Sequence, residues 1–141
     1  VQALYPGLRL WPDSAAQVAL EEASTTPMAG YSEKGRVEGD VRFQADPLEL
    51  AAVFVLEPRS PEDSDPAVTA EVLSPGDACM ALVRHAFQLN VTDPARAGAL
   101  MARAGEVADA APAYSLRYPK AFHRLASVRE AITTTVHGLA P

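Results

Sequence analysis

The sequence predicts a mixed α/β fold, and three observations support this fold class. Residues 48–57 and 68–73 are short runs of apolar and β-branched side chains, which is typical of strands. The runs Ser74-Pro75-Gly76-Asp77 and Thr92-Asp93-Pro94 carry the capping residues and prolines that begin helices. The predicted order is strand, helix, loop and hairpin, two strands, two helices, strand and helix, with too few strands for a complete doubly wound sheet.

The first third of the chain is predicted to hold one short strand, one helix and a polar connection. Residues 1–11 form the strand, and Asp13 or Ser14 begins a helix that runs to about residue 22. Residues 24–27, with the sequence STTP, are predicted to end this helix and open a loop. Residues 28–47 are polar and punctuated by glycines, which favours a loop with a hairpin.

Residues 48–57 are the clearest strand of the sequence. Val53 and Val55 occupy one face, and the other face is apolar as well; its members are Leu48, Leu50, Ala52, Phe54 and Leu56. Apolar side chains on both faces predict a central strand that is covered on both sides. Residues 59–66 follow as a charged, proline-rich surface loop, and 68–73 form the next strand.

The last half of the chain is predicted to be mostly helical. Helices are expected over 74–87 and from Asp93 to just before Pro112, each with a polar cap followed by proline. Residues 114–118 form a short strand or extended edge. Ser127 and Glu130 match the S-x-x-E capping box, which predicts that the final helix begins there and ends near His137.

Composition excludes several classes of function. The 141 residues carry a net charge of −6, and the basic side chains are scattered, so a nucleic-acid surface is not expected. The longest apolar stretch, 50–56, is too short to cross a membrane, and no signal peptide is visible. The cytoplasm is therefore the expected compartment. Cys79 is the only cysteine, which excludes an intramolecular disulfide and a multi-cysteine zinc site.

Several runs of the chain resemble a known family. They are Tyr5-Pro6-Gly7-Leu8-Arg9-Leu10-Trp11-Pro12-Asp13, Glu33-Lys34-Gly35-Arg36, Ala52-Val53-Phe54-Val55-Leu56-Glu57-Pro58, Leu82-Val83-Arg84-His85-Ala86-Phe87-Gln88-Leu89 and Ser115-Leu116-Arg117-Tyr118-Pro119-Lys120. Together they resemble the latter part of proteins related to HPr serine kinase, in the phosphoenolpyruvate-carboxykinase-like branch of P-loop proteins. The resemblance implies that residues 1–141 form a single domain, the C-terminal part of a larger one, with a partial P-loop kinase-like sheet and flanking helices.

The same resemblance implies ATP-dependent phosphoryl transfer, with Mg²⁺, to a serine of a protein or peptide. No G-x-x-x-x-G-K-[ST] sequence occurs in the chain, so the phosphate cradle of the family has no counterpart here. No catalytic residue is therefore carried over, and whether the chain is itself an enzyme stays open. An isolated half-sheet exposes an open edge and is expected to dimerise or aggregate, so the expected partners include a second copy or an upstream half of the same protein.

Lys34 and Arg36 are the candidate nucleotide-binding residues. Gly35 alone separates them, and the family resemblance implies that they lie near the nucleotide end of the sheet, where they would meet ATP phosphates. The alternative is a solvated hairpin tip. Arg9, in the first strand, is expected either to pair with a carboxylate such as Asp13 or to bind a phosphate.

The remaining candidates favour structural roles. His85, His123 and His137 show no metal-binding spacing, and Cys79 lies on the apolar stripe of its helix as a core thiol. Trp11 and Phe54 are also predicted to be core. A second function, of a different class, is a non-catalytic module that binds a partner through its alanine-rich helices or its basic 117–124 segment.

Overall fold

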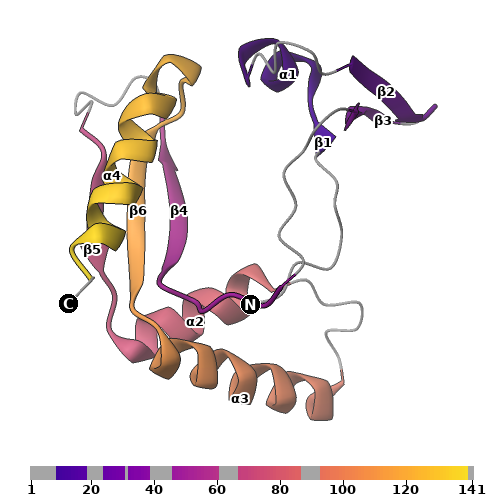
Figure 1. Ribbon diagram of the computed structural model, residues 1–141. Coiled ribbons are helices and arrows are strands. Elements are labelled where there is room, and N and C mark those ends of the chain that lie inside the picture. Colours follow the sequence, from indigo (N-terminus) through magenta and orange to yellow (C-terminus); the bar gives the residue numbers. More distant parts are fainter. Residues whose placement is uncertain are drawn as a thin grey trace. The chain divides into compact units, whose positions relative to one another are not determined.

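The computed structural model describes residues 9–18, 24–30, 32–38, 46–60, 67–86 and 93–139. It confirms a mixed α/β fold with two sheets and four helices among these residues (Figure 1). The chain divides into two compact units, residues 1–49 and 50–141. The partial P-loop kinase-like sheet and the single domain over 1–141 stay predictions.

The described residues of the 1–49 unit form a three-stranded antiparallel sheet and one helix. Its elements are β1 (Arg9–Leu10), α1 (Pro12–Val18), β2 (Ser24–Ala29) and β3 (Ser32–Glu38). The strand order is β1-β3-β2, so β3 is central and pairs with both neighbours. Val37 of β3 is buried, with 5% of its surface exposed.

The sequence predictions for the 1–49 unit are partly wrong. Helix α1 is confirmed over 12–18, whereas the predicted continuation to residue 22 includes positions outside the described residues. The loop predicted at 24–27 is instead strand β2, because pairing with β3 supplies its backbone hydrogen bonds even around Pro27. A register irregularity between Pro27 and Ala29 accompanies that proline, which has no N–H to donate.

The 50–141 unit is built on a second three-stranded sheet. Its strands are β4 (Val53–Arg59), β5 (Thr69–Val72) and β6 (Ala113–Pro119), in the order β4-β6-β5. β4 runs parallel to β6 and β5 runs antiparallel to it. The prediction that 48–57 is a central strand is therefore wrong: among the described strands, β6 occupies the middle and β4 lies at an edge. Leu48 precedes β4, and it and Leu56 are 58% and 54% exposed.

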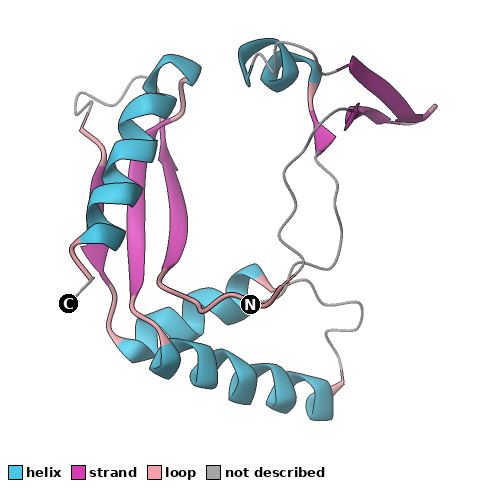
Figure 2. Ribbon diagram, viewed as in Figure 1, coloured by secondary structure: helices cyan, strands magenta, loops and turns pink. Residues whose placement is uncertain are grey.

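The helices of this unit are α2 (Pro75–His85), α3 (Pro94–Ala110) and α4 (Leu125–His137), and a short 3₁₀ turn, η1 (Phe122–Arg124), precedes α4 (Figure 2). The predicted caps at Ser74 and Asp93 are confirmed: each side chain accepts hydrogen bonds from amides of the first turn. The predicted cap at Ser127 is wrong. The 3₁₀ turn leads directly into Leu125, so the helix has already begun when it reaches Ser127.

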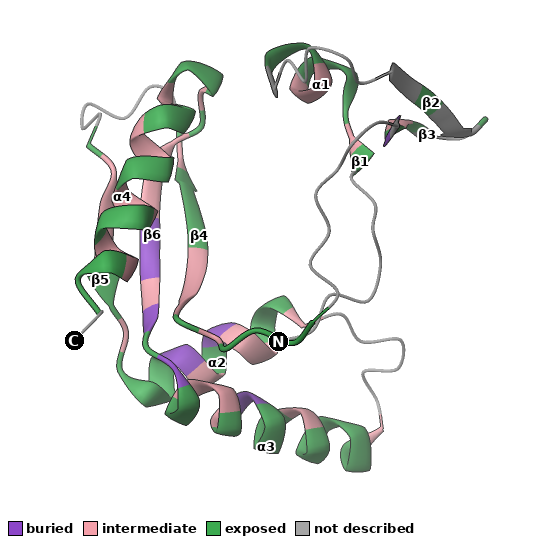
Figure 3. Ribbon diagram, in the orientation of Figure 1, coloured by how far each residue is buried: buried purple, intermediate pink, exposed green. Residues whose placement is uncertain are grey.

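The core of the 50–141 unit gathers where α2 and α3 pack together and along β6 (Figure 3). Leu116 of β6 is completely buried, whereas its neighbour in β4, Leu56, is mostly exposed. Phe54 and Tyr114 stack with their ring centres 5.5 Å apart. Most other buried side chains are alanines, which lets backbones approach closely; they are Ala78, Ala81, Ala104, Ala111 and Ala113. No helix among the described residues is long and apolar enough to cross a membrane.

Candidate functional site

Three cations share one face of the sheet in the 1–49 unit. Arg9 of β1 is the direct cross-strand partner of Arg36 of β3. Lys34 lies two residues before Arg36, next to the register shift of β3 against β2, and its ammonium lies over the ring of Trp11, the residue two after Arg9. We call Arg9, Lys34 and Arg36 the basic face. Their grouping depends on the pairing of β1 with β3.

The structure therefore moves Lys34 and Arg36 away from a hairpin tip. Both lie in the central strand, and the chain turns instead at Gly30, between β2 and β3. The alternative of a solvated hairpin tip is wrong. Arg36 is paired on both sides, with Arg9 of β1 and Thr26 of β2, whereas Lys34 lies where the pairing with β2 shifts register.

Trp11 lies beside the basic face. The Nζ atom of Lys34 is 5.0 Å from the centre of the Trp11 ring, within the range of a cation–π contact. The indole is 48% exposed, so the prediction that Trp11 belongs to the core is wrong. The contact follows from the register: Leu10 pairs with Gly35, so the next residue of the chain comes opposite Lys34.

The charges of the basic face suit an anion. Arg9 and Arg36 are directly opposite each other in paired strands, so their two guanidinium groups can approach the same anion. Arginine presents a planar fork of N–H donors that matches phosphate oxygens, and lysine adds a point charge. Thr26, the partner of Arg36 on the β2 side, is exposed. It places a hydroxyl-bearing residue beside the cations.

Asp13, the predicted partner of Arg9, lies in the first turn of α1. Its Oδ1 atom accepts a hydrogen bond from the backbone N–H of Ser14 at 2.7 Å and faces the Ser14 hydroxyl at 3.2 Å. A carboxylate in the first turn also suits the positive end of a helix dipole. These contacts give Asp13 a local role at the start of α1.

A second charged group lies on the sheet of the 50–141 unit. Arg117 of β6 donates from Nε to Oε2 of Glu57 in β4 at 3.0 Å, and its Nη1 lies 3.6 Å from Oε2 of Glu71 in β5. The Arg117 guanidinium lowers the pKa of Glu57, and the hydrogen bond to Glu57 raises the pKa of Arg117. All three side chains are 43–59% exposed. The group ties the three strands together across one face.

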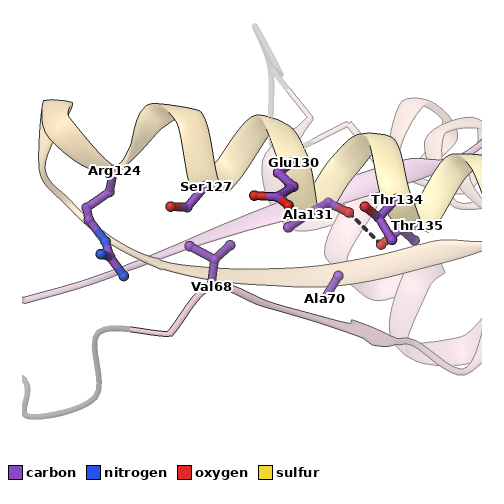
Figure 4. Close-up of a pocket in the computed structure, with 8 residues that line it drawn as sticks. All are labelled: Val68, Ala70, Arg124, Ser127, Glu130, Ala131, Thr134 and Thr135. Carbon is purple, nitrogen blue, oxygen red and sulfur yellow. Dashed lines mark hydrogen bonds between the residues drawn. The ribbon is translucent and has the colours of Figure 1, made fainter.

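The described residues of the 50–141 unit line at least two grooves. One, of about 460 Å³, runs between α4 and β5 and is lined by polar residues of the helix and by Val68 and Ala70 (Figure 4). The other, of about 260 Å³, lies between the start of α2 and the end of α3 and is lined mainly by alanines and prolines. The first groove offers hydroxyl, carboxylate and guanidinium groups, so it has the chemistry to bind a polar ligand.

The other predicted candidates are spread over separate elements. His85, His123 and His137 are exposed, each on a different helix or turn. Cys79 is half-buried, and its Sγ lies 3.6 Å from Sδ of Met101, where α2 meets α3. Across the described ranges, no three His, Cys, Asp or Glu side chains group in a way that could hold a metal ion.

Sequence reasoning missed three features of these sites: the joining of Arg9 to Lys34 and Arg36, the contact of Trp11 with Lys34, and the Glu57–Arg117–Glu71 group. The Lys-Gly-Arg spacing carried a signal for the first, since two cations separated by one residue share a face if the segment is a strand. No protein-family model, curated protein or solved structure matches the chain.

Proposed function

We propose that this chain is the part of an HPr-kinase-like, ATP-dependent serine kinase that follows the Walker region, and that its basic face binds nucleotide phosphates. The observation that carries the proposal is the direct pairing of Arg9 with Arg36 beside Lys34 on one face of a sheet. The sequence resemblance supports the reaction class, with the serine hydroxyl of a protein or peptide as acceptor.

The basic face fits a polyphosphate in charge and in hydrogen-bonding capacity. Two guanidinium groups and one ammonium offer donors for several phosphate oxygens, as charge-assisted hydrogen bonds require. Bound ATP would supply the phosphoryl group, and Arg9, Lys34 and Arg36 would hold its phosphates and offset their charge. We assign no Mg²⁺ ligand to the described residues, because none of them form a suitable cluster.

Calorimetry with Mg-ATP tests this proposal on the chain itself. We expect Arg36→Gln to weaken binding about 10- to 100-fold, because it removes a charge-assisted contact worth about 1.5–3 kcal/mol. The matched control is Arg103→Gln, which removes an exposed arginine from α3 and should leave the affinity unchanged. Equal affinity in the wild-type and Arg36→Gln proteins would refute the basic face as the nucleotide site.

A partner-binding module without catalysis is the second candidate. It is favoured by large apolar side chains that are exposed on the 50–141 unit, notably Val72 at 71% and Met80 at 51%. Exposed apolar groups of this size often mark contact surfaces. This candidate predicts partner binding without any binding of Mg-ATP, whereas the kinase proposal requires Mg-ATP to bind.

A further inference from the structure

The outer edge of β5 has the backbone geometry to pair with a further strand. In the strand order β4-β6-β5, no strand among the described residues pairs with the far side of β5. The N–H of Leu73 donates to the carbonyl of Ala113 at 2.8 Å, and these two residues are opposite each other in the register. In an antiparallel pair the hydrogen-bonded positions alternate, so Thr69 and Glu71 also bond to β6.

Ala70 and Val72 consequently point their N–H and C=O groups away from β6, toward the free edge of β5. Unpaired groups of this kind form a template for another strand. Val72 adds an apolar side chain that is 71% exposed. The edge therefore offers both backbone hydrogen bonds and apolar surface.

The opposite edge of the sheet, β4, is less suited to strand addition. Pro58 lies within β4 and has no N–H to donate, and proline within an edge strand is a common protection against pairing. β5 contains no proline. Of the two edges, β5 is the one that can accept a continuous ladder of hydrogen bonds.

The groove beside β5 adds side-chain chemistry to this edge. It has a volume of about 460 Å³ and is lined by Val68 and Ala70 from the strand side and by α4 from the other. Ser127, Glu130 and Thr134 are spaced three or four residues apart on α4, so they lie on one side of the helix, above the strand (Figure 4). The lining carries one carboxylate, that of Glu130, and one guanidinium, that of Arg124, which lies nearer the start of α4 (Figure 4).

We propose that an extended peptide segment of a partner protein adds to β5 as a further strand and places a basic side chain against Glu130. The backbone of the segment pairs with Ala70 and Val72, and its alternate side chains enter the groove, as in other cases of strand addition. The hydroxyls of Ser127 and Thr134 provide hydrogen-bonding groups for polar side chains of the segment. This binding shares no residue with the basic face and does not depend on ATP binding.

A second copy of the chain fits the edge less well. Two copies of β5 can pair as antiparallel strands related by a two-fold axis. Their outward N–H and C=O groups, at Ala70 and Val72, are all paired only when Ala70 of one copy is opposite Val72 of the other. That register sets Glu71 directly opposite Glu71 of the second copy, and like charges opposite each other destabilise paired strands. A basic peptide meets no such repulsion.

The test measures binding of fluorescently labelled hexapeptides to the protein by fluorescence anisotropy. Valine and threonine alternate in these peptides, and each peptide carries one lysine at a different position. We expect at least one peptide to bind, and Ala70→Pro to weaken it about 10-fold by removing an outward N–H. The same substitution removes no hydrogen bond to β6, so circular dichroism and thermal unfolding should show an intact fold. Glu130→Gln should weaken the lysine peptide a few-fold, and Glu106→Gln on α3 is the matched control.

Two results would overturn the proposal. One is that no peptide of the set binds, or that a folded Ala70→Pro protein binds as tightly as the wild type. The other is a dimer in sedimentation velocity that Ala70→Pro abolishes, together with no peptide binding, which would assign the edge to a second copy. Loss of ATP binding in the Arg36→Gln protein would leave peptide binding unchanged, so the two proposals fail separately.

Discussion

The ammonium group of Lys34 lies 5.0 Å from the centre of the Trp11 ring, at the border of the basic face. Trp11 is the only tryptophan of the chain, so its fluorescence reports on this one place. An anion that binds Arg9 and Arg36 also attracts the Lys34 ammonium and changes the polarity around the indole.

We therefore predict that inorganic tripolyphosphate changes the tryptophan emission in a saturable way. Lys34→Met should raise the concentration needed for half-saturation about 10-fold, since it removes one charge-assisted contact. Lys120→Met, at the only other lysine, is the matched control and should behave as the wild type. An emission change that persists undiminished in Lys34→Met would contradict the assignment.

The Glu57–Arg117 pair predicts a loss of stability in acid. The pKa of Glu57 is lower in the folded protein than its ordinary value of 4.5, because Arg117 hydrogen-bonds to the charged carboxylate. The stabilisation is present above the ordinary pKa and is lost as the pH falls through the lowered one. Since both side chains are over 40% exposed, solvent screening keeps the effect small.

Thermal unfolding of the wild type and Glu57→Gln checks this pH dependence. We expect the variant to melt about 1–3 °C lower at pH 7, and this difference to shrink as the pH falls below the ordinary pKa of 4.5. Glu106→Gln, on the exposed side of α3, serves as control. A difference between wild type and Glu57→Gln that grows toward low pH would reverse the expected sign and exclude this ion pair as its cause.

Leu116 and Leu56 are neighbours across β6 and β4, yet one is completely buried and the other 54% exposed. Leu116→Ala should lower the free energy of unfolding by about 2–5 kcal/mol, through lost burial and the cavity left behind. Leu56→Ala makes the same chemical change and should cost far less. Urea unfolding of both variants measures the difference, and equal losses would mean that the two strands carry equal shares of the core.

Ser74 and Ser127 both begin a capping-box sequence, but Ser74 lies at the start of its helix and Ser127 lies inside one. The Ser74 hydroxyl accepts from the N–H of Asp77 at 3.2 Å and donates to its carboxylate at 2.6 Å. Ser74→Ala should therefore cost about 1 kcal/mol of unfolding free energy. Ser127→Ala lies inside α4, away from its first residue, and should cost clearly less in the same urea titration. The reverse ranking would contradict the cap assignment.

These two serines also show which parts of the fold the sequence could predict. The cap at Ser74 works because Pro75 and Asp77 reinforce it within one turn, and the cap at Asp93 is likewise followed by Pro94. Ser127 and Glu130 satisfy the same pattern, but the 3₁₀ turn at 122–124 begins the helical path earlier. Local signals are sufficient where no neighbouring segment competes with them.

Strand identity and strand order required information from distant parts of the chain. Residues 24–27 became β2 through pairing with β3, although proline and short polar residues favoured a loop. The run 48–57 is apolar on both faces, yet β4 is an edge strand among the described residues. The central strand is β6, which comes about 60 residues later in the sequence. For the same reason, the sequence could predict the Lys34 and Arg36 pair but not its grouping with Arg9, which depends on the pairing of β1 with β3.

The late position of β6 in the sequence has a consequence for synthesis. Arg117 and Glu57 meet across 60 residues, and neither β4 nor β5 has a described strand partner other than β6. Both strands therefore leave the ribosome before the strand that joins them exists. Helices α2 and α3, whose contacts are closer along the chain, can pack first, and closing the sheet over the long intervening segment is the slower step.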